Sequence, residues 1–149
     1  MAKDMNIGAL RTNCFRQSKV KGEYMLQMRV PAGLIEAKYL GFVQHLATTY
    51  GDGTFHFGSR QCFAIPGIKY ENIDKVNKEL KDYLEDIEVA QCGVDMDTSA
   101  GYPTIGARNI MACIGGIHCI KANINTQEIA KKIEKEVFPS HYHIKVAVA

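Results

Sequence analysis

The order of apolar patterns over residues 1–95 constrains the fold of this chain more than any other feature. Residues 23–30 (EYMLQMRV) are typical of a strand, which Pro31 and Gly33 stop. A helical pattern follows and ends at the turn-forming residues 51–53. Its apolar positions, which recur at helical spacing, are Ile35, Tyr39, Phe42, Val43 and Leu46.

A hairpin and a second helix complete this pattern. Residues 54–57 and 61–65 predict two short strands around Gly58-Ser59-Arg60, and Pro66-Gly67 is expected to end the second strand. The next segment has the apolar positions of one helical face, namely Ile73, Val76, Leu80 and Leu84. Residues 87–94 are a candidate fourth strand. The resulting β-α-β-β-α-β order is the ferredoxin-like split unit, and it predicts an α+β fold with both helices on one face of an antiparallel sheet.

A different unit is expected after residue 95. Residues 95–107 are polar and rich in turn residues, and RNIMACIGGIHC follows at 108–119. A third helix is predicted to begin near Asn125, with Glu128 at the third position as in a capping box. The apolar face of that helix would be Ile129, Ile133 and Val137. The final HIKVAVA is typical of a strand and stops without a turn, which we interpret as the truncation of a larger protein.

Composition and charge exclude several classes of function. Apolar residues make up 46% and charged residues 23% of the chain, an ordinary globular balance. The formal net charge is +2 and no dense Lys/Arg cluster occurs, so nucleic acid is not an expected partner. No apolar run approaches the roughly 18 residues of a membrane span, and the first residues lack the apolar core of a signal peptide. We therefore expect a cytoplasmic protein with no membrane partner.

The cysteines are expected to be metal ligands, catalytic residues or buried small apolar groups rather than disulfides. There are five, an odd number at irregular spacing, which does not predict a disulfide framework. Cys113 and Cys119 enclose Gly115 and Gly116, and glycines let a backbone wrap closely around a bulky inorganic group. Thiolates are the preferred ligands of iron–sulfur clusters. The spacing alone also fits a zinc site with His118, although the two-residue spacing of zinc knuckles is absent.

Four segments carry a resemblance to a known family: GEYMLQMRVPAG, YGDGTFHFGSRQCFAIPGI, GYPTIGARNIMAC and PSHYHIK. Together they resemble the sirohaem-dependent nitrite and sulfite reductases over nearly the whole chain, most closely those of the anaerobic three-subunit type. The resemblance implies that residues 1–95 form the ferredoxin-like half domain of this family. It also implies that residues 96–149 begin, but do not complete, an α/β domain that binds sirohaem and a 4Fe–4S cluster.

The resemblance further implies which residues bind these cofactors. Cys113 and Cys119 would be two of four cluster ligands, one of them bridging to the sirohaem iron, and the second cysteine pair would follow residue 149. Sirohaem carries several carboxylates, and Arg60 lies where the family binds one of them. His56 and Arg29 are the other candidate cofactor-binding residues. From the residues alone, a solvated cation in a turn is the favoured interpretation of Arg60.

Arg108, Lys145 and His143 are the candidate catalytic residues. In the resemblance, Arg108 matches an arginine that contacts the substrate anion and Lys145 matches a lysine that faces it. His143 replaces a second lysine and can donate a proton near neutral pH, whereas Gln27 replaces an arginine. The anion pocket is therefore expected to hold one fewer fixed charge. Taken alone, Arg108 also fits a surface position, while a lysine in an apolar strand needs a partner or an open face.

The implied activity is the six-electron reduction of sulfite to sulfide by an oxidoreductase. Electrons would come from partner subunits that carry iron–sulfur and flavin groups, ultimately from NADH. Nitrite reduction on the same scaffold is the nearest alternative, and a cofactor-free ferredoxin-like binding or assembly module is an alternative of another class. A homodimer whose protomers exchange cysteines and cations is a further hypothesis. Without the second cysteine pair, this chain is expected to lack both cofactors and to be inactive.

Overall fold

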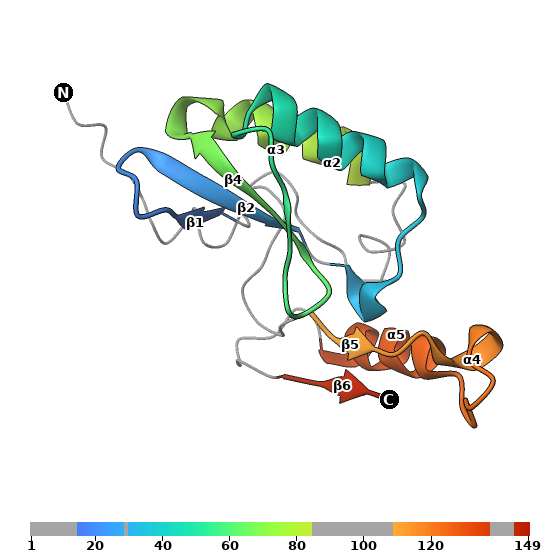
Figure 1. Ribbon diagram of the computed structural model, residues 1–149. Helices are drawn as coiled ribbons and strands as arrows, with labels where there is room; N and C mark the ends of the chain where they lie inside the picture. Colours follow the sequence, from blue (N-terminus) through green and yellow to red (C-terminus); the bar gives the residue numbers. More distant parts are fainter. Residues whose placement is uncertain (1–14, 29, 85–108, 138–144) are drawn as a thin grey trace.

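The computed structural model describes residues 15–28, 30–84, 109–137 and 145–149. Within these ranges the chain forms a four-stranded antiparallel sheet covered by two helices, and a smaller unit built on a two-stranded sheet (Figure 1). The predicted strand at 87–94 and the polar segment 95–107 lie outside the described residues. In the part of the chain that is described, no helix is long and apolar enough to cross a membrane.

The first two strands form a hairpin. Strand β1 (Phe15–Gln17) pairs antiparallel with β2 (Glu23–Met28). Tyr24, Leu26 and Met28 are buried and alternate with half-buried residues, because successive side chains of a strand point to opposite faces. The predicted strand at 23–30 is thus confirmed over Glu23–Met28. Strand β1 was not predicted, since three residues are too few to establish an alternating pattern.

Both predicted helices of the first unit are confirmed. Helices α2 (Lys38–Thr49) and α3 (Ile73–Leu84) follow the short turns η1 (Pro31–Gly33) and η2 (Tyr70–Asn72), and they lie side by side on one face of the sheet (Figure 1). The predicted apolar positions that lie within them pack into one core with the strands. Ile35 precedes α2 and is partly buried, and the side chain of Leu84 lies outside the described part of the chain. The buried residues of the two helices are Tyr39, Phe42, Val43, Leu46, Ala47, Ile73, Val76 and Leu80.

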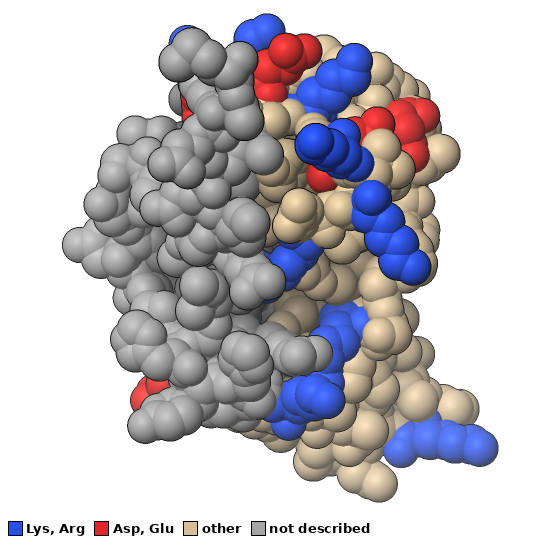
Figure 2. Space-filling model, turned by 90° about the vertical axis from the view of Figure 1, so that its left-hand side faces the viewer, with Lys and Arg blue, Asp and Glu red and all other residues tan. Residues whose placement is uncertain are grey.

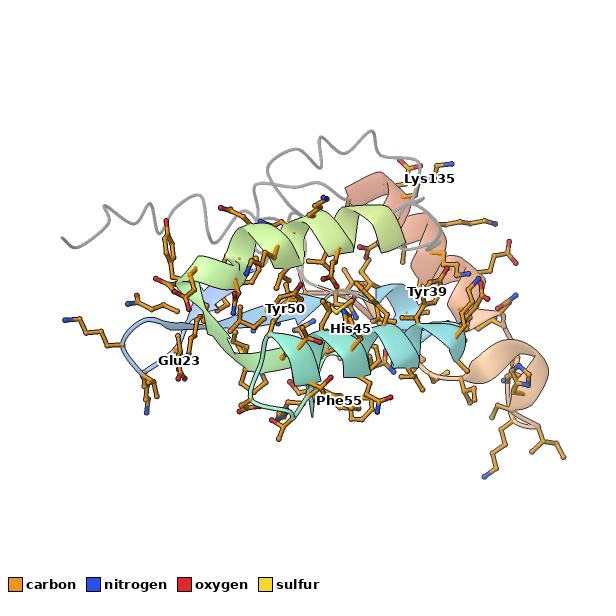
Figure 3. The ribbon with its side chains drawn as sticks, turned by 90° about the horizontal axis from the view of Figure 1, so that it is seen from above. Glu23, Tyr39, His45, Tyr50, Phe55 and Lys135 are labelled. Atoms are coloured by element: carbon orange, nitrogen blue, oxygen red, sulfur yellow. The ribbon has the colours of Figure 1, made fainter. Side chains whose placement is uncertain are left out.

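A polar contact joins the two helices above this core. Seen from above, His45 of α2 and Tyr50, which directly follows this helix, point toward α3 (Figure 3). His45 Nε2 lies 2.8 Å from Glu79 Oε2, and the Tyr50 hydroxyl donates to Glu79 Oε1. This hydrogen bond is the main cause that raises the pKa of Tyr50, because the hydroxyl keeps its proton more strongly when a carboxylate accepts it.

The predicted hairpin is confirmed, but its second strand is longer than expected. Strand β3 (His56–Phe57) pairs with β4 (Phe63–Lys69), which runs through Pro66 and Gly67 instead of ending there. A register shift against β2 accommodates them, and Gly67 takes a φ of +79° that favours glycine. The Pro66 carbonyl accepts the Asp52 N–H at 3.2 Å. The sheet order is β1-β2-β4-β3, and every pair is antiparallel as the ferredoxin-like pattern predicts, although β1 was not part of that pattern.

The smaller unit has its own core. Strand β5 (Met111–Ala112) pairs in parallel with β6 (Ala147–Val148), which confirms the strand predicted at the end of the sequence. Helix α5 (Thr126–Val137) packs against this pair, and the short α4 (Gly115–His118) precedes it (Figure 1). The buried residues here are Ala32, Ile110, Ala112 and Ala130.

The start of α5 agrees with the prediction, whereas its buried face is rotated. Asn125 Oδ1 accepts the Glu128 N–H at 3.2 Å, as a cap should. The most buried positions are Thr126, Ala130 and Glu134, whereas the predicted Ile129, Ile133 and Val137 are all partly buried. In the first turn of α5, Thr126 donates a hydrogen bond to the Cys113 carbonyl and lies on this buried face.

Two glycines near the first core give a matched pair of predictions. Gly41 is exposed within α2 and a Cβ there meets nothing within 4 Å, so Gly41→Ala should stabilise the chain by about 1 kcal/mol through helix propensity. A Cβ at Gly51 would lie 2.7 Å from the Pro66 carbonyl oxygen, so Gly51→Ala should destabilise it by about 1–3 kcal/mol. Urea denaturation of both variants measures these changes, and equal midpoints would contradict the packing described here.

Candidate functional site

A buried asparagine joins the two units. Asn109 is 5% exposed, and its Oδ1 accepts the Val30 N–H at 3.0 Å. Its Nδ2 donates to the carbonyl oxygens of Val30 at 2.8 Å and Arg60 at 2.6 Å. Asn109 therefore connects the chain just after β2 and the turn between β3 and β4 to the segment that leads into β5.

Gln61 makes a second connection between the same parts. Its Oε1 accepts the Ala112 N–H and its Nε2 donates to the Ala112 carbonyl, both at 2.9 Å. The side-chain amide thus pairs with β5 as a neighbouring strand would. Gln61 has a φ of +56°, a left-handed conformation that costs a non-glycine residue free energy and persists where surrounding contacts enforce it. The two amides fix the position of the hairpin turn relative to β5.

Arg60 lies in this turn and is half-buried. Its Nη1 donates to the Asn109 carbonyl at 3.4 Å. The alternative of a fully solvated turn cation does not describe this position, because the side chain contacts the junction between the two units. Within the described residues the guanidinium makes this one side-chain hydrogen bond, and its planar fork can bind the two oxygens of a carboxylate.

The remaining candidate cations are more exposed or lie outside the described residues. His56 is exposed on β3, with its Nδ1 3.2 Å from the Phe57 carbonyl oxygen. Lys145 precedes β6 and is exposed, which supplies the open face that a lysine in an apolar segment requires. Arg29, Arg108 and His143 lie outside the described residues.

Charge is unevenly distributed over the side of the molecule that Figure 2 shows. Lys and Arg side chains are spread along the described part of that face. Asp and Glu gather mainly at its upper end. The lower part, over the smaller unit, is therefore the more basic region and is better suited to an anion.

The segment from Cys113 to Cys119 turns back on itself after β5. Cys113 is exposed and Cys119 is half-buried, and both are free thiols. Gly116 takes a φ of +53° and donates its N–H to the Ile124 carbonyl at 3.2 Å. The Ala122 N–H bonds to the Cys119 carbonyl at 3.0 Å. These bonds hold a tight loop whose two thiols are of the donor type that iron–sulfur clusters use.

The described residues contain no group of three His, Cys, Asp or Glu side chains that could hold a metal ion. The zinc alternative needs Cys113, Cys119 and His118 together, and the structure does not bring these three side chains into such a group. For a cluster with four thiolates, two fitting ligands are present in the described ranges and the set is incomplete there.

The first turn of α5 contacts Cys113 directly. Thr126 Oγ1 lies 3.4 Å from Cys113 Sγ and donates to the Cys113 carbonyl at 3.0 Å. Gln127 Nε2 donates to the same carbonyl at 2.8 Å. Neither these residues nor Asn109 and Gln61 were singled out from the sequence. The available sequence signal was Asn109 itself, a polar residue directly before the apolar residues 110–112.

Comparisons with known proteins agree with this architecture. Residues 16–83 match the family described as the nitrite/sulfite reductase ferredoxin-like half domain. The chain is 44% identical to a subunit of the anaerobic sulfite reductase of Salmonella typhimurium, over 99% of this chain and 44% of that protein. It is 27% identical to the sulfite reductase (NADPH) hemoprotein beta-component of Bacillus pumilus, over 78% of this chain and 18% of that protein. The chain thus spans less than half the length of these relatives.

Solved structures show the same fold. The NirA protein of Mycobacterium tuberculosis superposes with a TM-score of 0.67 at 14% identity, over 93% of this chain and 27% of that one. Dissimilatory sulfite reductase I gives a TM-score of 0.62 at 15% identity, over 84% and 27% of the two chains. At such identities the likeness concerns the fold alone, and it confirms the predicted ferredoxin-like class.

Proposed function

We propose that the chain, whose residues 16–83 match the nitrite/sulfite reductase ferredoxin-like half domain, is the N-terminal part of a sulfite reductase that reduces sulfite to sulfide. The observation that carries this proposal is the 44% identity to a named sulfite reductase protein along 99% of the chain. The geometry supports it as well, since the Arg60 turn and the strand before Cys113 are bonded into one junction.

The proposal assigns sirohaem and a 4Fe–4S cluster to the full-length protein, and together these would supply the electron-transfer and reduction chemistry. Cys113 and Cys119 would bind iron, and Arg60 would bind a sirohaem carboxylate, with His56 and Arg29 as further candidates. The division into residues 1–95 and 96–149 remains a prediction.

The candidate catalytic residues would act on the substrate anion. Arg108 and Lys145 would neutralise its charge, and His143 would deliver protons as oxygen leaves as water. These roles are predictions for the complete protein. The exposed position of Lys145 before β6 is compatible with a side chain that reaches a bound anion.

The partners of the full-length protein are likewise proposed. The Salmonella relative is named as one subunit of its enzyme, which implies that this enzyme has others. We propose that electron-donor subunits with iron–sulfur and flavin groups, reduced ultimately by NADH, serve the present protein. A homodimer that shares its sites between protomers remains a hypothesis. Cytoplasmic location is also proposed.

The experiment that tests the function uses the full-length gene product, purified without oxygen. We expect visible absorption typical of sirohaem, bound iron, and oxidation of a reduced dye that depends on sulfite. Nitrite is the matched alternative substrate, and a higher kcat/KM for nitrite would reassign the enzyme to that anion. A colourless, iron-free protein after reconstitution would instead favour a ferredoxin-like binding module.

A further inference from the structure

The hydroxyl of Thr126 faces two acceptors of the same cysteine. Thr126 is 2% exposed, and its Oγ1 lies 3.0 Å from the Cys113 carbonyl oxygen and 3.4 Å from Cys113 Sγ. A hydroxyl carries one hydrogen and therefore donates to one of these acceptors at a time. The second distance is within the range of a hydrogen bond to sulfur, which is longer than one to oxygen.

Gln127 determines which acceptor needs the hydroxyl. Its Nε2 donates to the Cys113 carbonyl at 2.8 Å, so this carbonyl keeps a donor when the Thr126 hydroxyl turns away. A thiol can donate its own proton to Thr126 Oγ1, but a sulfur bound to iron has no proton and can only accept. Rotation about the Cβ–Oγ bond is then enough to direct the hydroxyl of Thr126 to Cys113 Sγ.

The chain around this contact is built to allow it. A Cβ at Gly115 would collide with Thr126 Oγ1 and would lie 3.2 Å from Cys113 Sγ, so glycine at this position leaves room for the threonine to reach the cysteine. Asn125 caps α5 directly before Thr126. The cap fixes Thr126 in the first turn, where the helix dipole also favours negative charge on the nearby sulfur.

We propose that Thr126 is a positioning residue that donates a hydrogen bond to Cys113 Sγ when this sulfur binds iron, and that it thereby raises the reduction potential of the iron centre. The inference rests on the proposed function. Hydrogen bonds to cluster sulfurs are among the features that set the potential, because they stabilise the more negatively charged reduced state. Gln127 supports this role by binding the carbonyl.

The test compares three variants of the full-length protein, purified without oxygen. Thr126→Val keeps the side-chain shape and removes the hydroxyl, whereas Thr126→Ser keeps the hydroxyl. Gln127→Leu removes the second donor to the Cys113 carbonyl, so that the Thr126 hydroxyl must stay on this carbonyl. We expect Thr126→Val to lower the reduction potential of the iron centre by about 59 mV. For a one-electron couple, this shift raises the ratio of oxidised to reduced protein roughly tenfold at a fixed solution potential. Thr126→Ser should stay near the wild type, and Gln127→Leu should shift in the same direction as Thr126→Val. A redox titration followed by electron paramagnetic resonance measures the potential.

Each outcome separates this inference from the proposed function. A wild-type protein without an iron centre would overturn the function itself. A normal iron content in Thr126→Val with an unchanged potential would overturn the role of Thr126 and leave the function standing. If Thr126→Val does not retain iron, the test uses Gln127→Leu instead. A reduction potential below that of the wild type in Gln127→Leu supports the inference, and an unchanged potential overturns it.

Discussion

Asn109→Ala is expected to destabilise the chain by about 3 kcal/mol or more. The substitution removes the acceptor of the Val30 N–H and the donor to the carbonyls of Val30 and Arg60. Each buried backbone group left without a partner costs about 1–3 kcal/mol, and Asn109 is 5% exposed, so water replaces these bonds poorly. The loss falls on the junction between the two units rather than within either core.

Urea denaturation of the chain measures this effect. Asn123→Ala is the matched control, because Asn123 is an exposed asparagine in the connection between α4 and α5, and its change should stay within about 0.5 kcal/mol. Asn109→Asp gives a sharper comparison. A carboxylate can still accept from Val30 N–H but places negative charge against two carbonyl oxygens, so it should be no more stable than alanine. Equal stability of wild type and Asn109→Ala would refute the role assigned to this side chain.

Cys113→Ser in the full-length protein is expected to remove at least nine-tenths of the cluster iron. A serine hydroxyl is a poor substitute for the soft thiolate that iron–sulfur clusters prefer. Cys62→Ala is the matched control, because Cys62 is a buried cysteine of the turn before β4 and accepts a hydrogen bond from Gln27 at 3.7 Å. That variant should keep its iron. Iron per chain and the visible spectrum measure both, and full iron in Cys113→Ser would exclude Cys113 as a ligand.

Elements with long, regular patterns were predictable from the sequence. Helices α2 and α3 each extend over twelve residues, so their apolar positions recur often enough to fix both the period and the buried face. The three residues of β1 and the irregular register of β4 at Pro66 and Gly67 carry no such periodicity. Their conformation depends on pairing with β2, which is a tertiary contact that local propensity does not report.

The same distinction applies to the candidate site. Cys113 and Cys119 were identified because their residue type and glycine-rich spacing are chemical signals within seven residues of sequence. Asn109 and Gln61 were missed because each bonds to backbone far away in the chain, Asn109 to Val30 across 79 positions and Gln61 to Ala112 across 51. Side chains that bind distant backbone leave no local pattern that identifies their partners. Thr126 was missed because its contact with Cys113 joins residues 13 positions apart. It also lies on a buried face of α5 that the apolar pattern did not include.

The parallel pairing of β5 with β6 has a consequence for the order of folding. In the first unit, short turns join β1 to β2 and β3 to β4, and α2 and β3 lie between the neighbours β2 and β4. Its core residues lie within residues 15–80, so this core can form once that segment has left the ribosome. Strand β6 pairs with β5 across 36 positions, with α5 between them. Because β6 leaves the ribosome well after the last residue of β4, the smaller unit should be the later step during synthesis. The first unit, with the Ala32 N–H already placed to donate to the Ile110 carbonyl, would then act as the template on which the smaller unit assembles.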